Sequence, residues 1–586
     1  MSVTTVLAMA ASVVIALSHG MSTAPASPGA TPPPDGPSIV ATTTAPPRAA
    51  CAPLGNDAAA LMADRYTFHP HATVRLPHDL TWAENPLKDG NWQYQFHSLR
   101  FLRTLIGAWR DTGDIAYRDR AIELLRDWLA DNPRTGSPSP YSWNDHSTAW
   151  RAMTMACVAE AIGLPDWLAS GLRLHGTTLA DPDFYVRVGN HALNQAIGLL
   201  DVGCVLGRQD WMTLARSRIA TLVTTSVDAE GVSNEQAVEY QAYNQRYYTA
   251  AGRRLQECGL TRPSGFDRVP KMATFLVHAT LPNGEYETIG DTAPVVSQFP
   301  GRSTGSRPST NRVIYRNAGW AFARTGWGTA RPFADEVHTS LRFGPARQHH
   351  GHLDGGSVTL YGYGRRLLID PGKYTYEASA WRTWFTGRTA HNVVTVDGLA
   401  FRNATATSLV AYRDSSRHTD TTVTHAGYAG VTSQRRVVFS TRLGYLLVED
   451  RLTSTSARTF RQAWHLDAGS DPVVGTSGIL TRRERGNVVI RQLIGAPVSR
   501  IVTGRTGPIQ GWTSSVYGTL VKAPVVEATL RGTRVRYLTL VVPGAAAPRV
   551  RVSSFRVTAS GYSMVLTVDG RTERVTVTST SSSITD

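Results

Sequence analysis

The chain has 586 residues, of which 42% are hydrophobic and 18% charged. This composition excludes a disordered protein, and the length exceeds one comfortable hydrophobic core, so two large domains are expected. Lys and Arg outnumber Asp and Glu by 60 to 45, giving a net charge of +15, which favours a polyanionic partner. Because no Lys/Arg-rich run interleaved with aromatic residues occurs, an acidic polysaccharide is favoured over nucleic acid.

The N-terminal residues are predicted to direct export. The stretch "VLAMAASVVIAL" (Val6–Leu17) is too short to span a bilayer comfortably and suits the apolar core of a signal peptide, predicted over residues 1–25. No Lys or Arg precedes it, which departs from the usual pattern. Residues 26–57 are rich in Pro, Thr and Ala and are predicted to be a linker. No other apolar run is long enough for a membrane span, so a secreted protein is expected.

The cysteines are Cys51, Cys157, Cys204 and Cys258. They show no CxxC spacing, which argues against a cysteine zinc site. Cys157 and Cys204 lie in apolar helical patterns and are most simply core residues. Disulfides are compatible with export, but the sequence does not select the partners.

Residues 58–305 are predicted to form an all-helical domain. In "NWQYQFHSLRFLRTLIGAWRD", apolar side chains recur every three or four residues, among them Trp92, Phe96, Leu99 and Leu102, as on one face of a helix. The same period returns in "AIELLRDWLADNP", "TAWRAMTMACVAEAIGLP", "NHALNQAIGLLDVGCVLG" and "QAYNQRYYTAAGRRLQECGL". Successive amphipathic helices with short loops indicate packed helical hairpins.

Residues 306–586 are predicted to form an antiparallel β-sandwich. Stretches such as "GSVTLYGYGRRLLID", "RRVVFSTRLGYLLVEDRL" and "YSMVLTVDGRTERVTVTS" are β-branched and aromatic, and Gly, Asp and Asn bound them. Many short strands without intervening helices indicate stacked antiparallel sheets. The change of period falls in "FPGRSTGSRPSTN", so the fold class is a multidomain α+β protein.

The segment "RQHHGHLDGG" (347–356) concentrates titratable groups. On a strand, His350 and His352 would face the same side and His349 the other. Asp370 and His391 follow at two further predicted strand ends, and zinc accepts this set of ligands. The alternative is that these side chains are hydrogen-bonded turn groups. No HExxH occurs, which argues against a zincin protease.

Two polar clusters in the helical half are candidates for substrate contacts. Asn190 and His191 directly precede an apolar helix, where an N-cap Asn with a surface His is the simpler interpretation. Glu235, Tyr240 and Tyr243 lie near another helix start, where tyrosines usually line a core or a groove.

A further set combines aromatic and basic residues. Trp143, His146 and Arg151 in "YSWNDHSTAWRAM" suit stacking on sugars and pairing with carboxylates. Arg388 and other arginines would tolerate a sulfated chain.

The stretch "HHGHLDGGSVTLYGYGRRLLIDPGKYTYEASAWRTWFTGRTAHNVVTVDG" resembles the heparinase II/III-type polysaccharide lyases, a group that includes similar alginate lyases. Weaker matches are "GNHALNQAIGLL", "DAEGVSNEQAVEYQAY" and "NWQYQFHSLRFL", so the resemblance covers most of residues 60–400. It implies an incomplete (α/α) toroid followed by antiparallel sheets. It also implies β-elimination at a uronic acid of a glycosaminoglycan, alginate or a related polymer.

The resemblance also implies residue roles. Asn190 and His191 match groups that neutralise the uronate carboxylate, on which negative charge develops. Tyr240 and His350 match the catalytic tyrosine and histidine. If elimination is syn, Tyr240 could act as both base and acid; if it is anti, His350 and Tyr240 would share the two steps.

A zinc ion is implied as well, on His352, Asp370 and His391. Three protein ligands with an open position are typical of catalytic zinc, but elimination needs no activated water, so a structural role is expected. Several members of the family use a second tyrosine after the Asp ligand. The spacing does not choose between Tyr374 and Tyr376.

Two other functions are alternatives to a lyase. A glycoside hydrolase needs two carboxylates that flank the bond, whereas Glu235 and Glu239 would share one face of a helix. A non-catalytic polysaccharide-binding protein would not need Asn190, His191 and the catalytic pair together. Heparan-type chains, hyaluronan, alginate and bacterial exopolysaccharides all contain a uronate, so the sequence predicts a polymer class and neither its identity nor an oligomeric state.

Overall fold

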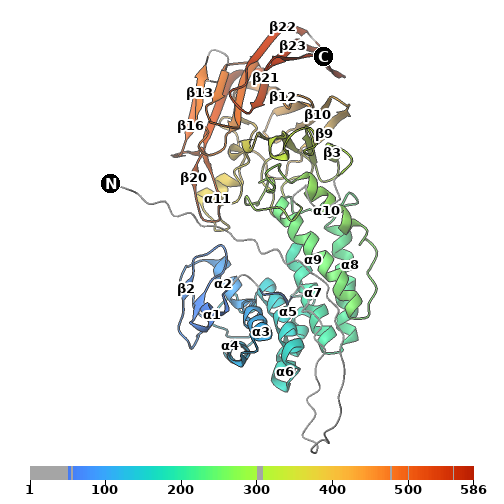
Figure 1. The fold of residues 1–586 in the computed structure, drawn as a ribbon, viewed down its shortest axis with the longest axis vertical. Helices are drawn as coiled ribbons and strands as arrows, with labels where there is room; N and C mark the ends of the chain where they lie inside the picture. Colours follow the sequence, from blue (N-terminus) through green and yellow to red (C-terminus); the bar gives the residue numbers. More distant parts are fainter. Residues whose placement is uncertain (1–50, 54–56, 300–307, 476–477, 499, 559) are drawn as a thin grey trace, which may run out of the picture. The chain divides into compact units, whose positions relative to one another are not determined.

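The computed structural model describes residues 51–53, 57–299, 308–475, 478–498, 500–558 and 560–586. The predicted signal peptide and residues 26–50 of the predicted linker lie outside the described residues. Helices form the first half of the described chain and antiparallel sheets form the second (Figure 1). The predicted multidomain α+β class is therefore confirmed.

The helical half consists of helices that pack on their neighbours in sequence, such as α5 with α6 and α7 with α8. The helices are α1 (Ala58–Met62), α2 (Gly90–His97), α3 (Leu102–Thr112), α4 (Ile115–Asp131), α5 (Asp145–Ile162), α6 (Asp166–Ala180), α7 (Gly189–Val205), α8 (Gln209–Thr225), α9 (Val238–Glu257) and α10 (Arg268–His278). A short hairpin, β1 (Arg65–Tyr66) with β2 (Val74–Arg75), precedes α2. None of the described helices has both the length and the apolar character required to cross a membrane.

Local sequence signals account for several helix ends. Asp89, Asp114 and Asn144 each accept a hydrogen bond from a backbone N–H of the first turn that follows, as N-cap residues do. Gly113, with φ of +76°, ends α3 in the left-handed conformation. The single periodic stretch over residues 91–111 is divided into α2 and α3, because Leu99 has a φ of +52°.

Two disulfides join all the cysteines, which corrects the interpretation of Cys157 and Cys204 as simple core residues. Cys51 is bonded to Cys157, 106 residues away, and Cys204 to Cys258, 54 residues away. The first bond fixes the end of the predicted linker to α5, so Cys51 is part of the folded domain. Both bonds lie within the helical half.

The second half contains a five-stranded, a ten-stranded and a four-stranded antiparallel sheet. The five-stranded sheet comprises β3 (Arg312–Tyr315), β4 (Trp320–Arg324), β5 (His338–Arg342), β6 (Val358–Gly362) and β7 (Arg365–Leu368). The ten-stranded sheet comprises β8 (Val394–Val396), β9 (Ser408–Asp414), β10 (His418–His425), β11 (Val431–Ser440), β12 (Leu446–His465), β13 (Pro472–Gly475), β14 (Gly478–Thr481), β15 (Asn487–Ile494), β16 (Arg500–Thr503) and β21 (Pro524–Gly544). The four-stranded sheet comprises β22 (Val550–Thr558), β23 (Gly561–Val568), β24 (Arg571–Thr578) and β25 (Ser582–Thr585).

Smaller elements complete this half. Two short hairpins pair β17 (Arg505–Thr506) with β18 (Ile509–Gln510) and β19 (Trp512–Thr513) with β20 (Val521–Lys522). The helix α11 (Ala380–Phe385) and the 3-10 turns η2 (Phe333–Asp335) and η3 (Arg388–Ala390) lie between strands.

The ten-stranded sheet is the middle of three layers. On β11, Val437 and Phe439 belong to a core shared with the five-stranded sheet, whereas Val438 between them belongs to a core shared with the four-stranded sheet. Leu446 and Leu447 on β12 divide in the same way. A strand that is buried on both faces needs apolar residues at every position, which explains the runs "RRVVFS" and "YLLVED".

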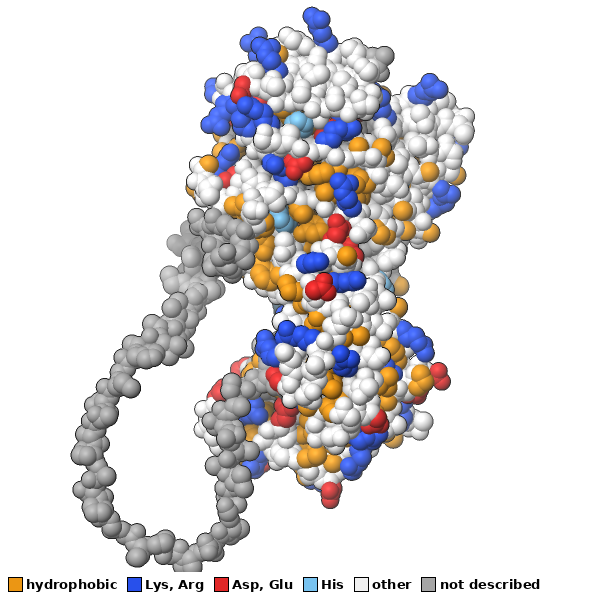
Figure 2. Space-filling model, turned by 90° about the vertical axis from the view of Figure 1, so that its right-hand side faces the viewer, with side chains coloured by type: hydrophobic (Ala, Val, Ile, Leu, Met, Phe, Trp, Pro, Cys, Tyr) orange, Lys and Arg blue, Asp and Glu red, His pale blue; other side chains and the backbone are white. Residues whose placement is uncertain are grey.

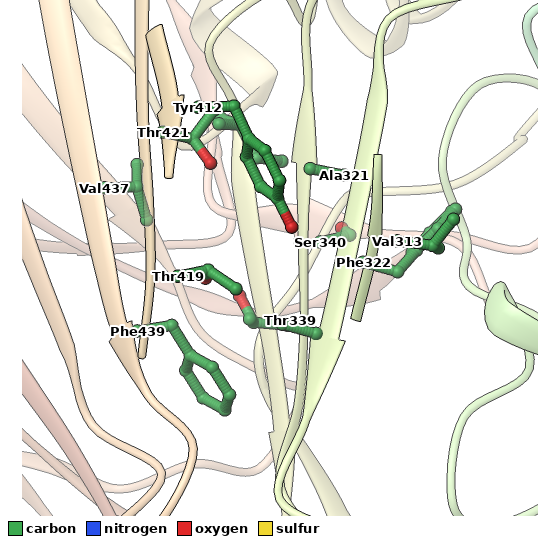
Figure 3. Close-up of a pocket in the computed structure, with 12 residues that line it drawn as sticks. Val313, Ala321, Phe322, Thr339, Ser340, Tyr412, Thr419, Thr421, Val437 and Phe439 are labelled. Carbon is green, nitrogen blue, oxygen red and sulfur yellow. The ribbon is translucent and has the colours of Figure 1, made fainter. Parts of the chain in front are cut away.

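The two larger sheets leave only a small space between them. Figure 3 shows side chains from β3 to β5 facing those of β9 to β11 around a cavity of about 20 Å³. That volume holds roughly one water molecule, so the cavity is part of the packed core. The substrate site must lie elsewhere.

The change from helix to sheet is less abrupt than the sequence predicts. Helix α10 ends at His278 and β3 begins at Arg312, so the predicted boundary at residue 305 falls among residues that the structure does not describe. Residues 279–299 have no long helix or strand, but pair through isolated bridges such as Thr280 with Tyr286. This connecting segment carries part of the site.

We predict that removing the Cys204–Cys258 disulfide by changing both residues to Ala lowers the free energy of unfolding by about 4 kcal/mol, because the unfolded chain loses a loop constraint of 54 residues. Denaturant unfolding of the variant and of the oxidised parent measures the difference. Equal stability of the two proteins would show that the disulfide does not constrain the unfolded chain.

Candidate active site

An open cavity of about 280 Å³ lies where α7, the segment before α9 and the β5–β6 loop meet. Its lining consists of Asp145, Val186, Val188, Gly189, Asn190, His191, Glu235, His349 and His350. The volume is close to the lower end of the range for small-molecule sites. Residues predicted from three separate sequence segments, Asn190 with His191, Glu235 and His350, therefore face one space.

Helix α7 begins at this cavity, and a buried carboxylate binds its first turn. Glu235 Oε1 accepts hydrogen bonds from the Asn190 backbone N–H at 2.8 Å and from Asn190 Nδ2 at 3.4 Å. A carboxylate here satisfies a free N–H group and interacts favourably with the helix dipole. The N-cap residue is Val188, so the interpretation of Asn190 as an N-cap is wrong. Its amide retains a second hydrogen to donate.

His191 is held on two sides and remains accessible. Its Nδ1 lies 2.8 Å from Asp145 Oδ2, and its ring stacks on His146 at a centroid distance of 4.0 Å. Burial alone would raise the pKa of Asp145, but the contact with His191 lowers it below the usual value. The side chain of His191 is 45% exposed. This arrangement leaves Nε2 free for a ligand.

Tyr240, His350 and Tyr376 form one group. The rings of Tyr240 and His350 stack in parallel with centroids 3.4 Å apart, and the Tyr240 and Tyr376 hydroxyls lie 2.8 Å apart. Tyr374 instead stacks on Phe385. Of the two tyrosines that the spacing could not separate, Tyr376 is the one that contacts the predicted catalytic pair.

The protonation of Tyr240 follows from its surroundings. Burial raises the pKa of this phenol well above its usual value, and the nearby carboxylates of Asp291, Glu239 and Glu235 raise it further. The hydrogen bond with Tyr376 offsets only part of this effect. The Tyr240 hydroxyl is therefore protonated at neutral pH.

Asp291 is central to the site, although it belongs to none of the predicted clusters. Its carboxylate is fully buried and contacts His350 Nδ1 at 3.0 Å, His352 Nε2 at 3.1 Å and both terminal nitrogens of Arg382, one of them at 2.8 Å. Burial would raise the pKa of Asp291, but these partners hold it well below its usual value. Because Asp291 occupies Nδ1, His350 presents Nε2 to its other neighbours.

A signal for Asp291 exists in the residue before it. Gly290 has a φ of +66°, and a Cβ atom there would lie within 3.0 Å of the His350 carbonyl oxygen. Only glycine permits this close approach of two backbones. The pair "GD" therefore marks the point where the connecting segment meets the β5–β6 loop.

The histidine-rich stretch is a loop and not a strand, which corrects the basis of one prediction. Residues 343–357 connect β5 and β6, so His350 and His352 do not share a strand face, although both contact Asp291. His349 has a φ of +40° and lines the cavity, so it does not point away from the site as expected.

His352, Asp370 and His391 come together as a possible metal site. Their donor atoms lie within 4.8 Å of one another, and all three side chains are buried. In the described part of the chain, His352 Nδ1 and His391 Nε2 have no hydrogen-bond partner. Burial raises the pKa of Asp370 to about 7 and lowers that of His391 to about 3. Two unpaired imidazole nitrogens and a poorly neutralised carboxylate fit a divalent cation such as zinc.

Three predicted substrate contacts are not available to a substrate. Arg151 is fully buried, where it donates to His175 at 2.8 Å and lies over Trp128. Trp143 packs beside it with 9% exposure. Arg388 is buried in the sheet half and donates to the carbonyl of Leu353. These cationic and aromatic side chains stabilise the two cores.

His146 and Tyr243 lie next to the cavity and support it. Asn194 on α7 contacts both, with Nδ2 at 2.7 Å from His146 Nε2 and at 2.6 Å from the Tyr243 hydroxyl. Burial lowers the pKa of His146 well below its usual value. A neutral His146 therefore stacks beneath His191 without adding charge to it.

Comparisons with known proteins agree with this arrangement. The model of the heparinase II/III N-terminus matches residues 54–161, and that of the heparinase II/III-like C-terminal domain matches residues 315–553. The chain belongs to the heparinase II/III family. The resemblance predicted from the sequence is confirmed, and the protein is an enzyme of a polysaccharide lyase family.

Individual relatives are distant but cover most of this heparinase II/III family member. A heparin-sulfate lyase of Bacteroides thetaiotaomicron is 22% identical over 88% of this chain and 82% of its own, and one of Pedobacter heparinus is 22% identical over 74% and 72%. Heparinase III has a TM-score of 0.73 at 18% identity, with 85% of each chain covered. Heparan sulfate lyase from Pedobacter heparinus has a TM-score of 0.66 at 20% identity, with 89% of this chain and 88% of its own covered. These structures confirm the predicted fold.

We predict that Asp291→Asn reduces kcat on an acidic polysaccharide by about 100-fold with little change in KM, because a small displacement of His350 disturbs the reacting geometry. The free energy of unfolding should also fall by about 3 kcal/mol, since Arg382 loses its charged partner. Steady-state kinetics and denaturant unfolding measure the two effects.

Asp354→Asn is the matched control, because Asp354 is also a buried carboxylate and lies in the loop that carries His350, but it is not among the contacts of His350. It should leave kcat unchanged. A kcat of Asp291→Asn equal to that of the parent would refute a positioning role for Asp291.

We predict that His391→Ala, or dialysis against a chelator, removes a bound divalent metal and lowers the free energy of unfolding by about 3 kcal/mol at free metal near 100 times Kd. His391 is preferable to His352 because His352 also contacts Asp291. Elemental analysis and calorimetry measure the two effects. His350→Ala is the control for metal content: it should keep the metal and the fold while losing activity, and loss of its contact with Asp291 should cost some stability. Full metal content in His391→Ala would exclude this site.

Proposed function

We propose that this protein is an exported lyase that cleaves a glycosaminoglycan at a uronic acid by β-elimination and leaves an unsaturated uronate end. The observation that carries the proposal is the contact of the Tyr240 phenol with the His350 imidazole, beside a cavity whose other wall carries Asn190 and His191. The relatives named as heparin-sulfate lyases support a glycosaminoglycan of the heparan sulfate type as the first substrate to test.

The first requirement of the reaction is to neutralise the uronate carboxylate. The proton on C5 is weakly acidic because its removal places a second negative charge on this group. The free amide hydrogen of Asn190 and Nε2 of His191 are the donors on the cavity wall. Donors that are held in place before the reaction stabilise such a charge without reorganisation.

The second requirement is a base and an acid. The burial of Tyr240 keeps its phenol protonated, so we assign it as the acid that protonates the departing glycosidic oxygen. His350, whose Nδ1 is held by Asp291, is assigned as the base that removes the C5 proton through Nε2. This division of the two steps between His350 and Tyr240 corresponds to anti elimination, whereas in syn elimination Tyr240 would perform both.

Zinc would have a supporting role in this scheme. His352, Asp370 and His391 would hold it, and the bound ion would supply the positive charge that the buried carboxylate of Asp370 lacks. His352 also contacts Asp291, so an occupied site would fix the loop that carries His350. The proton transfers themselves involve only protein groups and substrate.

A glycoside hydrolase is less well supported by the geometry. Glu235 is bound to Asn190, while Glu239 is paired with Lys373 Nζ at 3.1 Å and accepts from the Ala293 N–H. Both carboxylates are thus engaged in structural contacts. They do not flank a space between them, as the two acids of a hydrolase must.

Export is supported by two independent features. The apolar stretch Val6–Leu17 suits a signal peptide, and the cysteines of the described chain are all in disulfides. Disulfides persist in oxidising compartments and are rare in cytosolic proteins.

Ultraviolet absorbance of the unsaturated uronate tests the reaction on heparan sulfate, hyaluronan and alginate. We expect Tyr240→Phe to reduce the initial rate by about 10²–10⁴-fold, the usual contribution of a general acid. Tyr374→Phe is the matched control and should keep the parent rate, because Tyr374 packs on Phe385. New reducing ends without the chromophore would indicate a hydrolase, and an unchanged rate in Tyr240→Phe would refute the assignment of the acid.

A further inference from the structure

The outer face of the four-stranded sheet carries arginines that have no acidic partner. The inner face packs on the ten-stranded sheet through apolar residues such as Tyr562, Leu566 and Val575. Strand alternation then places the neighbouring residues on the outside. The outward residues are Arg551, Ser553 and Arg556 on β22, Ser563, Val565 and Thr567 on β23, Thr572, Arg574 and Thr576 on β24, and Ser583 and Thr585 on β25. We call this surface the arginine face.

No carboxylate belongs to the arginine face. Residues 550–586 contain only three acidic side chains, Asp569, Glu573 and Asp586, and each is engaged elsewhere. Asp569 lies in a turn and accepts from the Arg549 N–H at 2.9 Å. Glu573 is buried and pairs with Arg442, and Asp586 pairs with Arg417. Within the described residues, Arg551, Arg556 and Arg574 form no ion pair.

The register sets the pattern of charge on the arginine face. Arg551 lies opposite Thr567, Arg556 opposite Ser563, and Arg574 opposite Val565. Opposite charges directly across from each other stabilise a pair of strands, whereas here each guanidinium has a hydroxyl or an apolar side chain as its partner. Since β22 and β24 are two strands apart, their arginines are spaced by about 10 Å in the sheet.

This surface has the chemistry of a site for a polyanion. Guanidinium groups bind carboxylates and similar anions through paired hydrogen bonds, and the surrounding hydroxyls add further donors. None of the outward residues is aromatic, so the stacking platform typical of proteins that bind single-stranded nucleic acid is missing from the described face. At the upper end of Figure 2, where the sheet half lies, Lys and Arg side chains stand on a largely uncharged polar surface.

We propose that the arginine face is a second, non-catalytic site that binds the anionic polysaccharide on which the enzyme acts. The identity of this partner rests on the proposed function, whereas the preference for an anion rests on the face itself. The face belongs to the outer layer of the sheet half, while Asn190 and His350 line the cavity between the helical half and the β5–β6 loop. A long polysaccharide that binds the arginine face has a higher effective concentration at the catalytic cavity. A short oligosaccharide gains no affinity from this second site.

The test compares two full-length variants that lose the same charge. One carries Arg551→Ser, Arg556→Ser and Arg574→Ser. The other carries Arg110→Ser, Arg173→Ser and Arg253→Ser, three exposed arginines of the helical half. Each set is also placed on Tyr240→Phe so that binding to long heparan sulfate is measured without cleavage.

We expect the first variant to raise Kd for the long chain about tenfold, or about 1.4 kcal/mol, and to lower kcat/KM on that chain while its turnover of a tetrasaccharide is unchanged. The control variant should bind like its parent. An unchanged Kd in the first variant, an equal loss in the control, or equal competition by duplex DNA at the same salt concentration would each overturn the proposal. Failure of the proposed function would be seen separately, as a parent that releases no unsaturated product.

Discussion

The buried carboxylate of Asp291 is the constraint on which the rest of the site depends. A fully buried charge is strongly destabilising unless it is paired, and here Arg382, His350 and His352 supply the partners. The interactions that offset the cost of burial also fix the orientation of both imidazoles. The Asp291 N–H donates to the His350 carbonyl at 2.9 Å, so backbone and side chain hold the same loop. One acidic residue thus joins the proposed base to the proposed metal site.

Much of the fold is predictable from periodicity, because burial follows the repeat of each element. Helices α4, α5, α7 and α9 coincide with the periodic stretches, and the three-layered arrangement accounts for the uninterrupted apolar strands of the middle sheet. Helix α5 shows where the same logic fails. Its sequence predicts an amphipathic helix, but its residues are buried on nearly every side. Arg151 therefore lies in the core and not at the surface. Residue type alone does not reveal whether a cation faces solvent or an interior carbonyl.

Most residues of the candidate site could be predicted from the sequence, but the long-range contacts among them could not. Asn190, Glu235 and His350 do meet at one cavity, because the resemblance carried information about the fold that spacing lacks. The disulfide partners and Asp291 could not be predicted, since their contacts span between 54 and 106 residues and depend on how the halves fold together. Strand alternation predicts that His350 and His352 face one site, and they do lie close together, but the cause is different. Both imidazoles contact the carboxylate of Asp291, and neither residue lies on a strand.

The β5–β6 loop is attached to the helical half as well as to its own sheet. The Gln236 side chain accepts from the Gln348 N–H at 2.8 Å and donates to the Ala346 carbonyl at 2.9 Å, and the His350 N–H donates to the Glu235 carbonyl. These contacts hold the His350 ring against Tyr240, where it removes solvent from the phenol. In the proposed mechanism, the stacking that brings acid and base together therefore also keeps the acid protonated. Catalytic pairs are commonly separated in role by such differences in environment, and here burial together with the nearby carboxylates of Asp291, Glu239 and Glu235 creates one.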